Sequence, residues 1–178
     1  MKQVLTALTI AASLLASSAS SYDPADLQKL KDTGGCMKCD LESADMSGAS
    51  LESADLRRAN LKGADLSGAD LQGANLKEAN LEGANLKGAD LRSATFWDAN
   101  LKEADLRGAN LEGAYLRRAD LLRATLEGAD LRGVDLQGAN LWSVNLRGAD
   151  LSSSNLIEAK LNYAKMKGAI LCNTIMPD

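Results

Sequence analysis

Residues 75–91 read NLKEANLEGANLKGADL, and leucine returns there at every fifth position. Successive residues of an α-helix are rotated by about 100°, so leucines five apart do not share one face of a helix. Side chains of a flat strand alternate with a period of about two, so an odd spacing would place successive leucines on opposite faces. The spacing therefore predicts a chain that turns a corner every five residues and points each leucine inward.

The same phrase fills most of the 178-residue chain. If each leucine is taken as the centre of a repeat, the centres run from Leu41 to Leu171, and those that are not leucine are Met46, Phe96 and Met166. The residue two before the centre is alanine in 23 of 27 repeats, and the residue just before it is Asp in 11 and Asn in 9. These features predict a solenoid with leucine and alanine inside, whose Asp and Asn side chains accept hydrogen bonds from corner N–H groups.

Glycine indicates the number of corners in each coil. Most glycines lie two residues after a centre, and every fourth repeat from Gly48 to Gly168 has one. Another register of every fourth repeat nearly avoids glycine: it holds Arg58, Glu78, Asp98, Arg118, Gly138 and Glu158. This pattern predicts four corners and 20 residues per coil. Glycine suits the positive φ of a type II turn, so we expect a different turn type at the corner that avoids it.

The tandem phrases ADLSG, ANLEG, ANLKG and ADLRG resemble the pentapeptide-repeat family over residues 39–173. The resemblance implies an all-β solenoid, a right-handed four-sided β-helix, and it does not imply a common activity. We therefore expect residues 39–178 to form a rigid β-helical rod.

Residues 1–19 are typical of a signal peptide, with Lys2, an apolar stretch from Val4 to Leu15, and small residues at Ser17 and Ala19. The chain is therefore expected to be exported, to the periplasm or another extracytoplasmic oxidising compartment. The apolar stretch is shorter than the roughly 20 residues that span a bilayer, so we expect no membrane span. The net charge is −4 with both signs interspersed, which favours solubility, and no nucleic-acid partner is expected.

Residues 20–38 are predicted to form a capping helix and a lead-in with the sequence CMKC. Asp23 is a suitable N-cap, Pro24 suits the first helical position, and Gly34 ends the helix. Solenoids expose core at their ends, so this helix is expected to cover the first coil.

Cys36 and Cys39 of the CMKC segment allow three interpretations: a local disulfide, unbridged packing cysteines, or a redox or metal motif. The chain has no histidine and no second CxxC to complete a zinc site, so we expect no metal and no cofactor. Cys172 lies too many coils away to bridge to either cysteine. The absence of histidine also excludes Ser-His and Cys-His nucleophiles, and a convex rod offers no cleft, so we expect no enzyme.

One outward column changes character along the rod. Its charged part runs from Glu42 to Lys102, and Leu122 and Trp142 follow it. Tyr163 lies beside the end of this column, and Ile157 points outward one side away. A contiguous apolar patch of this kind predicts a binding surface for a protein partner that the sequence does not identify, and the alternative is a set of tolerated isolated exposures.

The repeat decays near the C-terminus, where Lys160, Lys165 and Ile170 replace Asp or Asn. Exposed Ile170, Ile175 and Met176 predict an end-to-end homodimer, unless the last degenerate turn is itself the cap. Elsewhere, Trp97 is expected to lie between Lys77 and Arg117 in cation–π contacts.

Two other functions are open. A column of mostly acidic residues runs from Asp70 to Asp150, and some members of the family bind type II topoisomerases through acidic, duplex-shaped surfaces. Arginines such as Arg92 and Arg132 lie beside that column and are expected to neutralise much of it. The remaining alternative is a thiol-redox protein that uses Cys36 and Cys39.

Overall fold

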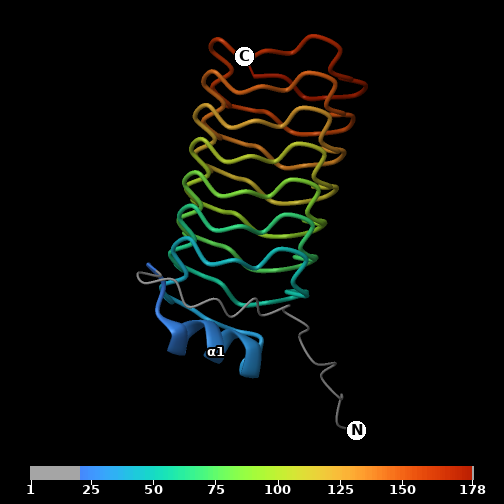
Figure 1. The fold of residues 1–178 in the computed structure, drawn as a ribbon. Helices are drawn as coiled ribbons and strands as arrows, with labels where there is room; N and C mark the ends of the chain where they lie inside the picture. Colours follow the sequence, from blue (N-terminus) through green and yellow to red (C-terminus); the bar gives the residue numbers. More distant parts are fainter. Residues whose placement is uncertain (1–20, 178) are drawn as a thin grey trace, which may run out of the picture.

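A computed structural model describes residues 21–177 as a rod of stacked coils, with helix α1 (Pro24–Thr33) beneath the N-terminal end (Figure 1). Parallel bridges join residues 20 positions apart, and the four bridges of one coil are Asp40 with Asn60, Asp45 with Asp65, Ser50 with Asp70, and Asp55 with Asn75. The coil therefore has four sides and 20 residues per turn. Within residues 21–177 the β structure consists of such isolated bridges, because the chain turns again before a longer strand can form.

Backbone hydrogen bonds between coils follow one scheme on every side. The N–H of Leu101 donates to the carbonyl of Asp120 (2.7 Å), and the N–H of Glu103 donates to that of Leu122 (2.9 Å). In the opposite direction, the N–H of Asp120 donates to the carbonyl of Ala99 (2.9 Å). Each side thus sends two N–H donors toward the C-terminal end of the rod for each carbonyl that faces the same way.

The interior is filled as the spacing predicts. Every centre from Leu41 to Leu156 is at most 1% exposed, and the alanines between them are buried too. Ser154 takes an alanine position and is the one buried polar side chain among residues 21–177; its hydroxyl donates to the carbonyl of Leu151 (2.6 Å). Burying a leucine side chain contributes about 1.5–3 kcal/mol, so this continuous column is the main source of stability.

The expectation of a second turn type is wrong. Arg58 (φ 59°) and Arg118 (φ 54°) adopt the same left-handed conformation as Gly108 (φ 62°). The N–H of Arg118 donates to the carbonyl of Gln137 on the next coil (3.0 Å), as corner glycines do. Tyr163 keeps this conformation (φ 61°) without a bond to a next coil in the described chain, so every corner adopts the same conformation whichever residue occupies it.

Helix α1 closes the N-terminal end. The Asp23 carboxylate accepts from the N–H of Ala25 (2.8 Å), and Gly34 ends the helix with a left-handed φ of 67°, so both predicted cap signals are confirmed. Leu30 of α1 is buried against the first coil. The N–H of Asp23 and the hydroxyl of Ser21 donate to the carbonyls of Asp40 and Glu42, which have no preceding coil to bond. The predicted signal peptide, residues 1–19, lies outside the described residues.

Candidate interaction surfaces

Trp142 and Tyr163 form an exposed aromatic pair near the C-terminal end of the rod. Their ring centroids lie 5.1 Å apart and their planes are tilted by 53°. The side chains are 42% and 75% exposed, respectively. Tilted aromatic pairs at this separation attract one another, so the pair is held as a unit on the surface. The structure therefore brings together two of the residues that were predicted to bind a partner.

The other two residues of the predicted patch lie differently. Leu122 is half-buried, one coil below Trp142, so it offers less surface than the sequence suggested. Ile157 is 38% exposed on the neighbouring side of the coil. The aromatic pair is the centre of the surface, and Leu122 and Ile157 belong to its margin.

Trp97 provides a contrast. It is 40% exposed, but the guanidinium of Arg117 donates to Asp135 on the next coil. Within residues 21–177, the aromatic contact is the one between Trp142 and Tyr163. The cation–π contacts predicted for Trp97 do not form in this part of the chain. Trp97 is thus an isolated exposed tryptophan.

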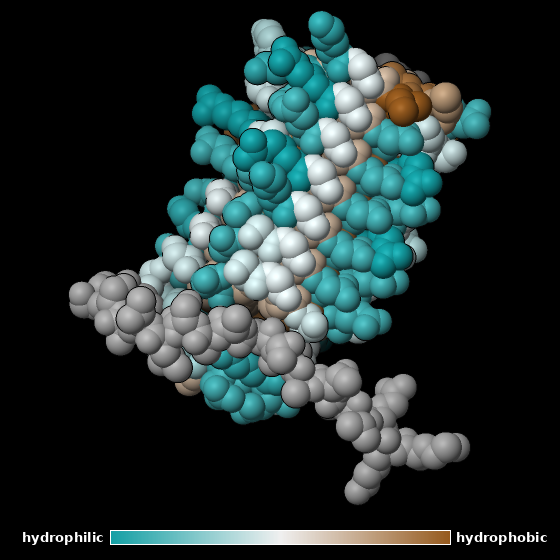
Figure 2. Space-filling view, turned by 45° about the vertical axis from the view of Figure 1, so that its right-hand side comes forward, coloured by the Kyte–Doolittle hydropathy of each residue, from teal (hydrophilic) through white to brown (hydrophobic). Residues whose placement is uncertain are grey.

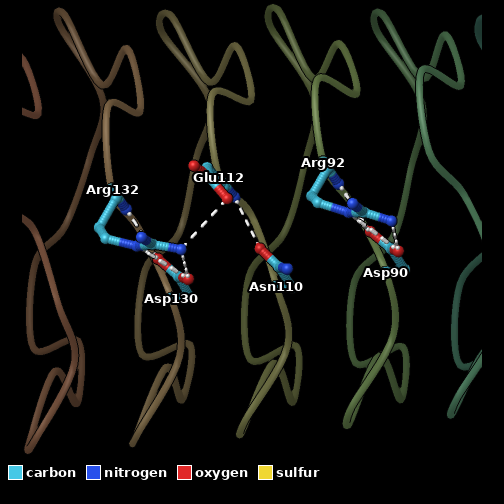
Figure 3. A network of polar contacts seen from close by, with 6 residues as sticks. All are labelled: Asp90, Arg92, Asn110, Glu112, Asp130 and Arg132. Carbon is cyan, nitrogen blue, oxygen red and sulfur yellow. Dashed lines mark hydrogen bonds and ion pairs between the residues drawn. The ribbon is translucent and has the colours of Figure 1, made fainter.

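The column from Asp70 to Asp150 carries ion pairs (Figure 3). Arg92 bonds Asp90 (2.5 Å), and Arg132 bonds Asp130 (2.6 Å) and Glu112 (3.1 Å). The hydrogen bonds from these arginines lower the pKa of Asp90 and of Asp130 below the ordinary value of 3.8. A shallow, open depression lies beside Glu112 and Arg132. Two carboxylates of the column, Asp90 and Asp130, are thus paired with arginines of the same rod, which reduces its acidic character.

The predicted Asp and Asn side-chain bonds occur throughout. The side-chain oxygen of Asn80 accepts from the N–H of Glu82 (3.3 Å), and it also accepts from the side chain of Asn100 on the next coil (2.9 Å). These polar columns stabilise corners and join neighbouring coils.

The structure joins Cys36 and Cys39 in a disulfide where the first coil meets α1. The two residues are 0% and 2% exposed, so neither sulfur is open to attack by a thiol. Asp26 is near both, but its carboxylate accepts from the N–H of Asp40 (2.8 Å), and the sulfurs are bonded to each other. The site thus fits a structural clamp between cap and coil better than a redox or metal centre. Cys172 is exposed and unpaired in the described part of the chain.

The C-terminal end of the rod exposes apolar side chains. Ile170, Ile175 and Met176 are 46%, 54% and 42% exposed, and Leu171 is exposed beside them. Figure 2 shows a hydrophobic patch near this end on a face that is otherwise mostly hydrophilic. In the described range, the helix present is too short and too polar to cross a membrane.

Comparison with known families decides the classification. The family described as pentapeptide repeats matches residues 36–73, 59–98, 69–108, 99–138 and 135–173, and together these segments span the rod. The chain is a pentapeptide-repeat protein. Membership implies a right-handed quadrilateral β-helix, in agreement with the four-sided coil. Proteins of this family generally serve as structural or interaction modules.

Three solved structures are similar to this pentapeptide-repeat protein. HetL, involved in heterocyst differentiation regulation in the cyanobacterium Nostoc sp. strain PCC 7120, is 40% identical, with 81% of this chain and 70% of HetL covered and a TM-score of 0.49. QnrB1, a plasmid-mediated fluoroquinolone resistance protein, is 23% identical, with 79% and 70% covered and a TM-score of 0.45. A pentapeptide repeat protein from the Arabidopsis thaliana thylakoid lumen is 32% identical, with 68% of each chain covered and a TM-score of 0.39. The search of curated proteins gave no match.

Proposed function

We propose that this pentapeptide-repeat protein is an exported, noncatalytic rod that binds another protein through the surface centred on Trp142 and Tyr163. The exposed aromatic pair is the observation that carries the proposal. Tryptophan and tyrosine are enriched among the residues that dominate binding energy at protein interfaces. The surrounding rod is lined by hydrophilic columns, which makes the pair a distinct anchor.

The rod is suited to present such a surface without rearrangement. A continuous buried core runs from Leu41 to Leu156, and every coil is bonded to the next. Presenting a preformed surface avoids the entropic cost of ordering it on binding. Export is supported by the pattern of residues 1–19 and by the disulfide between Cys36 and Cys39, which persists in an oxidising compartment.

The binding surface can be tested with two tryptophan variants. Full-length chain, Trp142→Glu and Trp97→Glu would each be used to capture proteins from an extract of the source cells, with quantification by mass spectrometry. Trp142 and Trp97 are 42% and 40% exposed, so both variants place a charge at a similarly accessible site. We expect Trp142→Glu to lose at least about tenfold of the specifically captured protein, as for removal of a central aromatic anchor. Trp97→Glu should capture as much as the wild type.

Equal capture by Trp142→Glu and the wild type would contradict the proposed surface. Equal loss in both variants would also contradict it, because the effect would then follow surface charge and not the aromatic pair. Unfolding midpoints of the three proteins should agree, which establishes that each variant keeps the fold.

A further inference from the structure

The surroundings of Trp142 and Tyr163 determine what kind of ligand the pair suits. Residues 98–105, 118–125, 138–145 and 158–165 lie one above another in four successive coils, and we call them the aromatic face. Five basic and five acidic residues lie on this face, so its net charge is zero: Lys102, Arg118, Arg123, Lys160, Lys165, Asp98, Glu103, Asp105, Asp120 and Glu158. Such a balance favours an uncharged ligand over a polyanion or a polycation.

The exposure of Tyr163 follows from its place on the coil. It occupies the corner two residues after a centre, where side chains point outward along the whole rod. Arg118 and Arg123 occupy corners that have a coil on either side, and their side chains are still 72% and 68% exposed. A further coil stacked above Tyr163 would therefore leave its ring accessible.

The aromatic pair also carries two hydrogen-bond donors that find no acceptor among residues 21–177. They are the indole N–H of Trp142 and the hydroxyl of Tyr163. The bond that Trp142 does donate comes from its backbone N–H, which reaches the side-chain oxygen of Asn140 (3.3 Å). An indole N–H can only donate. A ligand that suits the pair therefore combines apolar groups, which cover the rings, with acceptors for these donors.

An added β-strand does not fit the aromatic face at Trp142. Strand addition requires a backbone edge whose N–H and C=O groups are not yet bonded. The N–H groups of Leu141 and Ser143 already donate to the next coil (2.9 and 2.8 Å), and that of Asn145 donates to the previous coil (3.0 Å). The ladder is complete there, so a ligand must bind through side chains.

An amphipathic helix fits poorly as well. Such a helix binds in an apolar groove through side chains at positions i, i+3, i+4 and i+7, which span about 10 Å. In the coil before Trp142, Leu122 is half-buried, and beside it the exposed Arg123 forms an ion pair with Glu103 (3.5 Å). The exposed apolar area is therefore narrow and consists mainly of the two rings.

We propose that Trp142 and Tyr163 bind a proline-rich segment of the partner in the polyproline II conformation; this inference rests on the proposed function. Proline-rich segments are recognised by aromatic side chains and need neither a strand edge nor a deep groove for a helix. Their proline rings are apolar and uncharged. The carbonyls of a polyproline II helix have no partner within the helix, so they can accept from the indole N–H and the hydroxyl.

The test uses the full-length chain and a decaproline peptide blocked at both ends, with calorimetric titration. A blocked Gly-Ser peptide of equal length is the control ligand. We expect decaproline to bind and the Gly-Ser peptide not to bind. Trp142→Ala should weaken the binding of decaproline at least about tenfold, as for loss of a central aromatic anchor. Trp97→Ala is the matched control at a similarly exposed site, and it should bind like the wild type.

Two further variants test the hydrogen bond. Tyr163→Phe keeps the ring and removes the hydroxyl, so we expect binding to weaken about two- to tenfold. Tyr115→Phe removes another exposed hydroxyl and should have no effect. In Trp97→Phe the remaining tryptophan is Trp142, and its fluorescence should change when decaproline is added. Equal unfolding midpoints would establish that each variant keeps the fold.

Several outcomes would overturn the proposal. It is wrong if decaproline does not bind, if the Gly-Ser peptide binds equally well, or if Trp97→Ala weakens binding as much as Trp142→Ala. Binding of cellohexaose at Trp142 without binding of decaproline would assign the pair to a glycan. If Trp142→Glu loses its captured protein but decaproline does not bind, this inference fails and the proposed function stands. If capture is unchanged and decaproline does not bind, both fail.

Discussion

At the scale of single residues, the corner position two after each centre imposes the sharpest requirement. Gly108 has a φ of 62°, and a β-carbon added there would meet no atom within 4 Å. A side chain at Gly108 therefore costs backbone strain and no steric clash. Residues with a β-carbon lose roughly 1–2 kcal/mol in this left-handed region.

We predict that Gly108→Ala lowers the free energy of unfolding by about 1 kcal/mol, as measured by urea denaturation. Gly35→Ala is the matched control. Gly35 lacks a left-handed φ, and its added β-carbon would lie 3.5 Å from that of Asp55, an ordinary contact. Alanine reduces the freedom of the unfolded chain equally at both sites. If the two variants were equally stable, corner strain would not limit the sequence.

The sequence indicated which corners prefer glycine, but it did not reveal the conformation of the others. Arg58, Arg118 and Glu158 have no intrinsic preference for positive φ, and their letters alone suggested another turn. The N–H groups of Arg58 and Arg118 donate to the next coil, but Glu158 keeps the same φ without such a bond within residues 21–177. Each corner is closed by a turn hydrogen bond instead, as from the N–H of Ala119 to the carbonyl of Leu116 (3.1 Å), and the repeated turn overrides local preference at these positions.

At the scale of elements, the capping helix at the N-terminal end could be predicted from the sequence because its signals are local. Asp23, Pro24 and Gly34 occupy the positions where capping chemistry requires them. For the cysteines, spacing left three interpretations open, and only the packing of α1 over Cys36 and Cys39 distinguishes them.

Cysteine alkylation checks the cap and the proposed export together. In protein taken from the periplasmic fraction without reductant, we expect iodoacetamide to label Cys172 alone, because Cys172 is exposed and the other two cysteines are joined. After unfolding and reduction, all three cysteines should react. Labelling of Cys36 or Cys39 in the folded, unreduced protein would contradict the disulfide. Recovery of the chain only from the cytoplasm would contradict export and leave the fold unaffected.

At the scale of the whole molecule, arginine–carboxylate pairs repeat along the rod and make the stability of the fold depend on pH. Hydrogen bonds from Arg92, Arg107 and Arg132 lower the pKa values of Asp90, Asp105 and Asp130 below 3.8. A lowered carboxyl pKa in the folded state stabilises the fold above the ordinary pKa, and this contribution is lost as the pH falls through the folded pKa.

We therefore expect the thermal midpoint to change little through these pairs from neutral pH to about pH 4 and to fall at lower pH. In Arg132→Gln, the pKa of Asp130 should rise toward 3.8, which an NMR titration of its carboxyl carbon would detect. Lys102→Gln removes the same charge beside Asp120 and should leave Asp130 unchanged. If the pKa of Asp130 were the same in Arg132→Gln as in the wild type, the ion pair with Arg132 would not be what lowers it.

The two periods of the chain, five residues for the interior and 20 for the surface, set different rules for changes in length. Duplication of 20 residues lengthens the rod and leaves every outward column aligned. Insertion or deletion of a single five-residue unit also keeps leucine and alanine in the interior. It moves every downstream residue to the next side of the coil, however, which is a quarter turn around the rod. Such a change between Trp142 and Tyr163 would separate the aromatic pair while the core stayed intact. Mutations in repeat number can therefore alter the surface that this rod presents without first destabilising it.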